Sequence, residues 1–218
     1  MSSPSLIHRG FLLLGVSMLC LGSLQAQVTT PGLLKALQGK EKKALQTRVA
    51  HNARQVGIAL FAFHADYNKL PGEATIKSLS EVAKDGVKIA ADSANECFFQ
   101  LLVGGYVDNP AVFSPLERDR GRGNVGADKK LANCFYSYIP SKGFDRAERP
   151  LMVAPLIKGK TTFNPKPLGG KAVVMFSDLS VRILDINEDG VVKLNGKDLF
   201  DPQQGYWEGE KPQIKWQE

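Results

Sequence analysis

The sequence is poor in the residues that build metal centres and catalytic sites. It has three cysteines and three histidines among 218 residues. It contains neither the His-Glu-x-x-His pattern of zinc hydrolases nor the Gly-x-Ser-x-Gly turn that presents a nucleophilic serine. Its long apolar run, Phe11 to Leu24, is shorter than the roughly 20 residues that a membrane-spanning helix needs. The missing motifs argue against both classes of hydrolase, and we do not expect an enzyme. The short apolar run argues against a membrane-spanning helix.

The chain has the composition of a globular protein. Hydrophobic residues make up 43% and charged residues 23%, which excludes general disorder and a collagen-like repeat. The length fits one domain of ordinary size or two small ones. With 21 glycines and 12 prolines, the chain is expected to be rich in loops. No nucleic-acid-binding motif is present, so nucleic acid is not an expected partner.

Residues 1–26 have the features of a secretory signal peptide. Arg9 precedes the apolar run, and Ala26 provides a small residue at the cleavage point. We therefore expect a mature chain that starts after Ala26 and is periplasmic or secreted. Prepilin-type cleavage is the alternative, because Arg9-Gly10-Phe11 resembles the cleavage site of type IV prepilins, and it would leave an inner-membrane anchor. The resemblance is incomplete, since Gly15 stands where pilins have Glu.

Export changes the interpretation of the cysteines. Cys20 is lost with the leader, so the mature chain keeps Cys97 and Cys134. An oxidising compartment favours a disulfide between these two residues, which we expect. The alternative is two separate thiols, each buried beside aromatic residues.

Positive charge is concentrated in one segment. The formal net charge is +6, and residues 33–54 contribute +5 of it, from six basic side chains and one acidic one. The six are Lys35, Lys40, Lys42, Lys43, Arg48 and Arg54, and the acid is Glu41. A basic helix of this kind suits anionic lipid or an acidic partner, and the ordinary alternative is a solvated face. A membrane is thus an expected partner only through this segment or an uncleaved leader.

Residues 33–68 are expected to form one long helix. The segment lacks proline, and its apolar residues recur every three or four positions. One stripe consists of Val49, Ala53, Val56, Leu60, Phe63 and Tyr67. A second apolar face begins after residue 56, so we expect the start of the helix in solvent and its end inside a domain. Thr29–Gly32 should interrupt any earlier helix, and Lys69–Gly72 should end this one.

The end of this helix resembles a known family. Asn52 to Leu60, followed by Tyr67 to Pro71, is similar to the helix end of type II secretion pseudopilins of the major, G-like kind and of related exported families. The resemblance implies a pilin-like fold, in which a long N-terminal helix packs on an antiparallel sheet. It also implies a structural or accessory role.

Two later segments are similar to the same group, which extends the resemblance to about residues 49–186. Phe113-Ser114-Pro115 matches a Phe-x-Cys-Pro segment with Ser in place of Cys. Val173 to Asp178 resembles the closing strand of the family, which usually continues Gly-His-Val. Here Leu179-Ser180-Val181 follows instead, so whatever the Gly-His pair supplies is missing.

Residues 71–218 are expected to form an α+β globular domain against the linker and long helix over 27–70. Ser93–Leu102 is expected to be a short helix. The expected strand segments are Phe135–Ile139, Leu151–Ile157, Ala172–Phe176, Val181–Ile186 and Val191–Leu194. Short turns between successive strands predict an antiparallel sheet, and the buried half of the long helix would cover one face of it.

Asp185-x-Asn187-x-Asp189-Gly190 has the pattern of the first half of a calcium loop. Alternate oxygen side chains converge on one ion, and Gly permits the sharp turn at the sixth place. The twelfth place lacks the Glu of an EF-hand, so the expected calcium ligands are Asp185, Asn187, Asp189, Val191 and Asp198. The resemblance adds weight, because G-like pseudopilins bind calcium in a late loop. An ordinary hairpin turn is the alternative, since Asn, Asp and Gly are also turn residues.

Three other features are interpreted as structural. Gly121–Gly126 spells Gly-x-Gly-x-x-Gly, but no buried strand precedes it, so we expect a surface loop. His51 and His64 point about 220° apart on a helix, at roughly 100° per residue, and cannot share a metal ion. The aromatic tail Gly205–Trp216 is expected to cover a sheet edge, with partner binding as the alternative.

The expected function is that of a non-enzymatic, exported, pseudopilin-like structural or accessory protein of the cell envelope or of type II secretion, with envelope proteins as partners. The alternative is a soluble periplasmic binding module that depends on calcium. Retention of the apolar leader segment separates the two hypotheses, because filament subunits pack through it.

Overall fold

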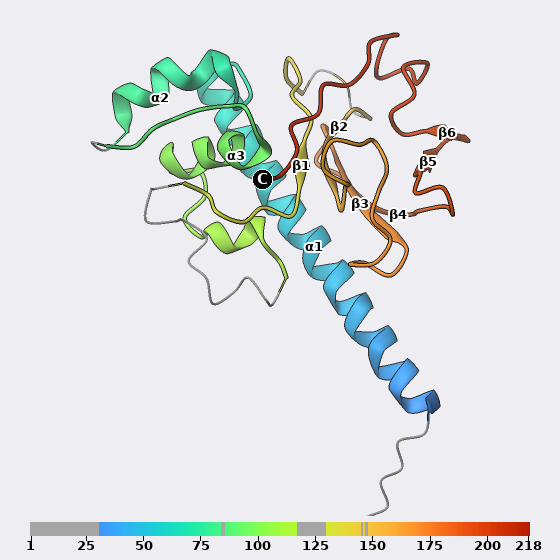
Figure 1. Ribbon diagram of the computed structural model, residues 1–218. Helices are drawn as coiled ribbons and strands as arrows, with labels where there is room; N and C mark the ends of the chain where they lie inside the picture. Colours follow the sequence, from blue (N-terminus) through green and yellow to red (C-terminus); the bar gives the residue numbers. More distant parts are fainter. Residues whose placement is uncertain (1–30, 84–85, 117–129, 145, 147) are drawn as a thin grey trace, which may run out of the picture.

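The computed structural model describes residues 31–83, 86–116, 130–144, 146 and 148–218. Within these ranges, one long helix, a four-stranded antiparallel sheet and several short helices form an α+β fold (Figure 1). The leader over 1–26 and the glycine-rich segment 121–126 lie outside the described residues. No helix in the described part of the chain is long and apolar enough to cross a membrane.

The long helix, α1, spans Pro31–Tyr67. It begins two residues earlier than the periodicity predicts, so Pro31 and Gly32 belong to its first turn. The predicted interruption of an earlier helix at Thr29–Gly32 stays a prediction, because residues 1–30 lie outside the described ranges. Proline is tolerated at the first helical position because the N–H that it lacks has no helical partner there. The helix ends where Asn68 adopts a φ of 52°, with its N–H donating to the His64 carbonyl at 2.8 Å. A left-handed residue is a common helix terminator.

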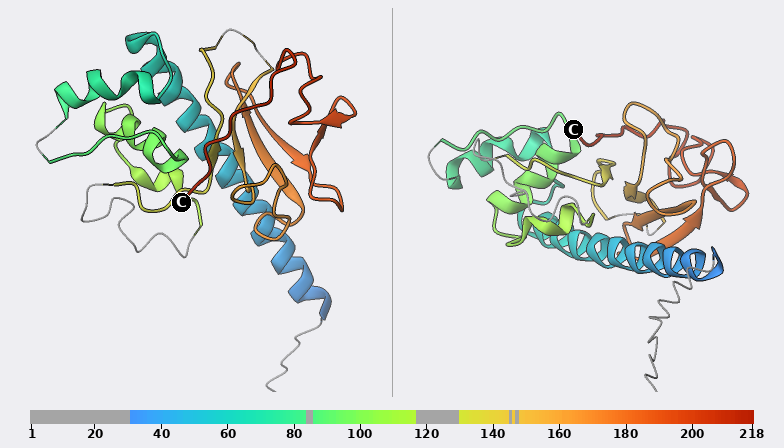
Figure 2. Two further views of the ribbon diagram at one scale, coloured as in Figure 1. Left: turned by 45° about the horizontal axis from the view of Figure 1, so that its top comes forward. Right: turned by 60° about the horizontal axis from the view of Figure 1, so that its bottom comes forward.

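The two halves of α1 differ in burial as predicted, but the second apolar face, which was expected inside the domain, is exposed at Ile58 and Phe61. Five residues of the expected stripe are completely inaccessible to solvent: Val49, Ala53, Val56, Leu60 and Phe63. Residues 35–44, by contrast, are exposed at every position. The left view in Figure 2 shows this first part of the helix extending beyond the body of the molecule.

The main sheet has the strand order β1-β2-β3-β4, and all neighbours are antiparallel. Its strands span Ser137–Tyr138, Pro150–Ala154, Lys171–Phe176 and Val181–Asp185. Each overlaps a predicted strand segment, and β3 and β4 join through the expected hairpin at 177–180. A smaller hairpin pairs β5, Lys193–Leu194, with β6, Lys197–Asp198. Strand β5 falls within the predicted segment Val191–Leu194, whereas β6 was not predicted.

Strand β3 is buried on both faces of the sheet. Val173 and Met175 pack into the core beneath α1, whereas Val174 and Phe176 pack into a second core. Helix α1 approaches β3 closely at Gly57, where an added Cβ would lie 3.1 Å from the Met175 sulfur. The predicted cover of one face by the helix is therefore confirmed, but the second face is covered as well.

The C-terminal segment provides the second cover. Leu199, Phe200, Tyr206 and Trp207 are buried in the core on the far side of the sheet. The final residues then form an edge contact, because the Tyr138 and Lys215 backbones exchange two hydrogen bonds of 2.8 Å. This confirms the expectation that the aromatic tail covers a sheet edge.

Short helices pack beside α1. The predicted helix is α3, Ala94–Val103, and Ser93 caps it by accepting a hydrogen bond from the Glu96 N–H at 3.2 Å. Helix α2, Ile76–Val82, and two 3₁₀ turns, η1 at Glu73–Thr75 and η2 at Pro110–Phe113, were not predicted.

The expected disulfide is not formed in this structure, where Cys97 and Cys134 are both free thiols. The Cys97 sulfur lies 3.6 Å from the Ala91 carbonyl oxygen and the Cys134 sulfur 3.3 Å from that of Tyr136. Burial raises the pKa of each thiol to about 12. The alternative of two separate thiols in apolar surroundings describes the structure, and such thiols are poor nucleophiles at neutral pH.

The contact at Gly57 gives a test of the packing of α1. We expect Gly57→Leu to lower the free energy of unfolding by about 1–3 kcal/mol, because the new side chain has to displace Met175. Urea denaturation measures the change. Gly39→Leu is the matched control: nothing lies near a Cβ at Gly39, and leucine is the better helix former, so stability should hold or rise. Equal stability of the two variants would contradict the observed packing.

Candidate functional surfaces

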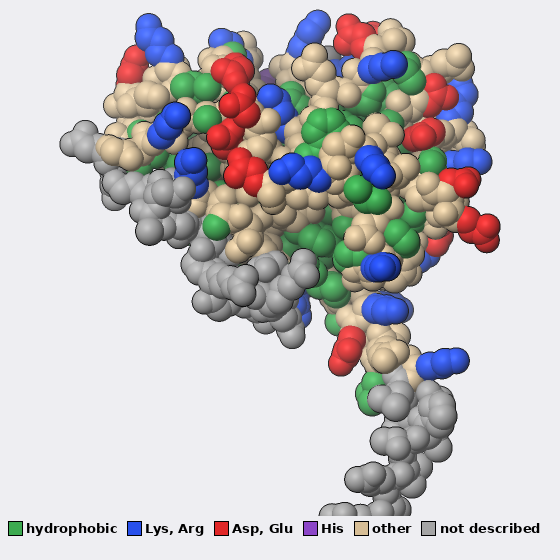
Figure 3. Space-filling view, viewed as in Figure 1, with side chains coloured by type: hydrophobic (Ala, Val, Ile, Leu, Met, Phe, Trp, Pro, Cys, Tyr) green, Lys and Arg blue, Asp and Glu red, His purple; other side chains and the backbone are tan. Residues whose placement is uncertain are grey.

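The first part of α1 is an exposed, positively charged surface. Residues 35–44 hold four of the six basic side chains identified in the sequence, together with Glu41. Figure 3 shows these charges along the stretch of helix that leaves the body. Of these side chains, Lys42 lies beside the body, since a Cβ added at Gly169 would be 3.0 Å from its Cδ. A helix of this length with so few tertiary contacts is marginally stable in water. It therefore depends on propagation from the buried half of α1, or on a partner, to remain helical.

A second exposed surface on α1 is apolar. Ile58 and Phe61 are one turn apart and remain 54% and 50% exposed, although the opposite side of the same helix is buried. The Phe61 ring meets the half-buried Phe144 ring edge to face, with centroids 5.3 Å apart, and His64 lies 5.5 Å from Phe144. Sequence reasoning missed Phe144, because it stands in a loop without periodicity. Phe144 can be assigned to this surface only from its contacts with Phe61 and His64.

The calcium-loop pattern forms a hairpin turn in the structure. The Asn187 side-chain oxygen accepts a hydrogen bond from the Val191 N–H at 2.7 Å, and Gly190 has a φ of 77°. Asp185 is engaged by the Lys171 ammonium group. This is the alternative that the composition of the turn allowed, since Asn and Asp side chains cap turns by binding nearby backbone N–H groups.

The three carboxylates among the expected calcium ligands do not come together in the described part of the chain. The Asp198 carboxylate accepts a hydrogen bond from the Phe200 N–H at 2.8 Å, within its own turn. Across the described ranges, no group of three or more His, Cys, Asp or Glu side chains could hold a metal ion. Asp185, Asp189 and Asp198 therefore do not form a shared carboxylate cluster here.

The two histidines take part in local contacts. His51 lies one turn from Gln55, with 3.2 Å between the two side-chain nitrogens. His64 packs against Phe144 and Gly143 near the end of α1. Their separate surroundings agree with the prediction that they do not share a ligand.

Comparison with known proteins adds nothing to this picture: no protein-family model, curated protein or solved structure matches the chain. Function has to be inferred from the molecule itself. The surfaces that stand out are the basic first part of α1 and the apolar flank at Ile58 and Phe61.

The hairpin at Asp185–Gly190 gives a clear expectation for calcium. Because Asn187 and Asp198 are already used by backbone N–H groups and Asp185 by Lys171, millimolar calcium should leave the Tm unchanged. Thermal unfolding with and without the ion measures this. A rise in Tm that Asp189→Ala abolishes, while Glu188→Ala in the same turn does not, would contradict the structural role given to this loop.

Proposed function

We propose that this chain is a non-enzymatic, exported, pilin-like structural or accessory protein of the cell envelope, which acts through α1. The observation that carries the proposal is the division of this helix. Its second half forms the core of the domain, and residues 35–44 are exposed on every side. An exposed helical extension of this kind can bind a partner protein or a membrane surface.

The positions of the family-like motifs support a pilin-like fold. Gly57 belongs to the motif Asn52–Leu60 and Met175 to the motif Val173–Asp178, and these two residues are in contact. Phe113 of the third motif is fully buried and belongs to the same core. The three segments that carry the resemblance thus meet in one place, although more than a hundred residues separate the first from the last.

One difference from the family pattern lies in the β3–β4 turn, where the structure shows its effect on the backbone. Leu179 stands where the resemblance places Gly, and it adopts a φ of 64° in the β3–β4 turn. Glycine suits such a left-handed position, whereas leucine costs about 1–2 kcal/mol there. The turn is nevertheless held, since the Leu179 N–H donates to the Phe176 carbonyl and the Ser180 N–H to the Asp178 carboxylate.

A second function, that of a soluble periplasmic binding module, has a separate basis. The loop at Asp185–Gly190, from which it was first inferred, gives it no support. A cleft beside Arg149 at the other end of the sheet does favour it.

The N-terminus of the protein in its native cell tests the proposal of export. We expect intact mass and N-terminal sequencing to find the chain in the envelope fraction, starting at Gln27 or, after prepilin processing, at Phe11. A chain that keeps Met1 and is recovered from the cytoplasm would contradict it.

Attachment through α1 is tested by site-specific photocrosslinking in cells. We expect a crosslinker at Leu37, on the exposed part of the helix, to give a discrete adduct with an envelope component. The matched control is Val82, which is 63% exposed on α2 and should give none. Equal labelling from both positions would show that α1 has no special role.

A further inference from the structure

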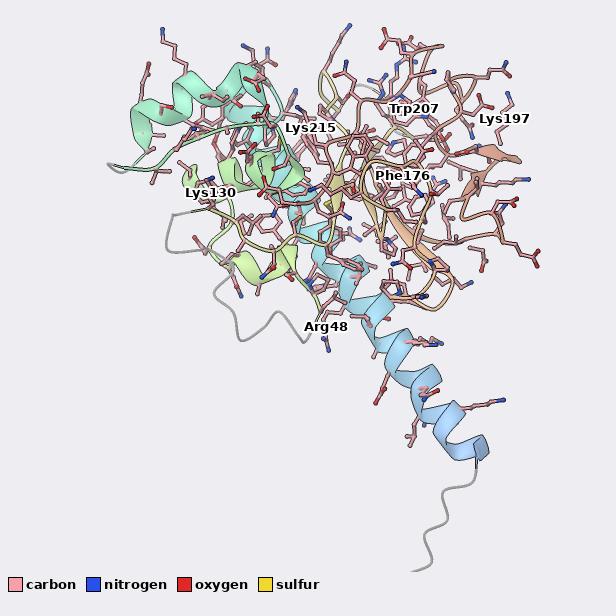
Figure 4. The ribbon with its side chains drawn as sticks, in the orientation of Figure 1. Arg48, Lys130, Phe176, Lys197, Trp207 and Lys215 are labelled. Carbon is pink, nitrogen blue, oxygen red and sulfur yellow. The ribbon has the colours of Figure 1, made fainter. Side chains whose placement is uncertain are left out.

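A cleft lies between two segments that are far apart in the sequence. One wall comes from the connection between β1 and β2, with Ser141 and Arg149, and the other from the C-terminal segment after Trp207. Its volume is about 320 Å³, which is within the range of small-molecule sites. Figure 4 places Trp207 at the end of the molecule away from the exposed part of α1. The cleft is therefore independent of the surfaces on which the proposed function rests.

Arg149 is held in this cleft by neutral groups. Its Nε donates to the Tyr206 carbonyl at 3.0 Å and one terminal nitrogen to the Ser141 hydroxyl at 3.2 Å, and its guanidinium carbon lies 5.8 Å from the centre of the Trp207 ring. Nowhere in the described ranges does a carboxylate pair with it. A guanidinium has five N–H donors and stays charged, so Arg149 keeps N–H groups and a whole positive charge for another partner.

The charges around Arg149 favour an anion. Lys142 and Lys211 line opposite walls of the cleft and are exposed. Of the two acidic residues on its lining, Glu208 is paired with Arg146, which leaves Glu210 against three cations. The excess is therefore two positive charges, which favours an anionic ligand.

The walls also have an apolar part. The indole of Trp207 is fixed, because its Nε1 donates to the Leu199 carbonyl at 2.8 Å, and Pro140 and Pro212 lie beside it. We propose that this cleft binds a small carboxylate-bearing molecule with a cyclic or apolar body. Arg149 binds the carboxylate through its unused N–H groups, and Lys142 and Lys211 add attraction. The body of the ligand lies against Pro140 and Pro212, with a small contact to Trp207, which is 3% exposed.

Benzoate is a suitable probe for this site, with benzamide as its uncharged counterpart. NMR titration of the full chain follows the Trp207 indole N–H and the Arg149 Nε–H signals. We expect saturable shifts of both signals with benzoate and binding of benzamide at least about ten-fold weaker, which is a difference of about 1.4 kcal/mol. Inorganic phosphate is expected to bind more weakly than benzoate, because it lacks an apolar body.

Variants on the rim keep the test independent of folding. The exposed pair Lys142→Gln and Lys211→Gln should together weaken benzoate binding about five-fold without changing the Tm. Lys193→Gln on β5 is the matched control, because Lys193 is exposed and does not line the cleft. Equal affinity for benzoate and benzamide, unchanged binding by the double variant, or tighter binding of phosphate would each overturn the assignment. None of these outcomes bears on export or on attachment through α1.

Discussion

The close packing of α1 on β3 is the constraint on which the rest of the structure depends. Gly57 removes a side chain where the helix crosses Met175, so that the helix and the strand approach each other directly. Burial of the stripe from Val49 to Phe63 then places one face of the sheet in the core. Because this contact uses only the second half of the helix, residues 35–44 stay exposed, and of them the Lys42 side chain lies beside Gly169 of the domain.

The face of the sheet opposite α1 also has to be buried. A strand such as β3, with apolar side chains on both faces, has to be covered twice, and the chain after β4 supplies the second cover. That segment ends by pairing with β1 at Tyr138, which protects the open edge of the sheet. Its path past Arg149 also creates the cleft. The molecule thus offers two unlike surfaces, an extended basic helix and a fixed polar cleft, at opposite ends.

Local patterns in the sequence predicted where helices and strands lie better than they predicted what those elements pack against. The apolar residues that recur every three or four positions from Val49 onwards were enough to predict α1. The apolar runs at β3 and β4 were likewise enough to predict those strands, because periodicity is a local property. The double burial of Val174 and Phe176 was missed, since it depends on residues that follow much later. The residue types at Asp185–Gly190 suit a calcium loop and a hairpin turn equally, so the sequence could not separate the two. The structure shows the hydrogen bond of a hairpin turn at Asn187, and calcium binding stays a prediction. The cleft had no signal, because its walls are about sixty residues apart.

Hydrogen–deuterium exchange along α1 in the full chain tests the central claim most directly. The amides of residues 49–63 belong to the core and should exchange only through unfolding of the domain, at rates similar to those of β3. The amides of residues 35–44 should exchange much faster in the isolated protein, because these residues are exposed at every position. Uniform protection along the whole helix, or rapid exchange in the segment from 49 to 63, would contradict the account.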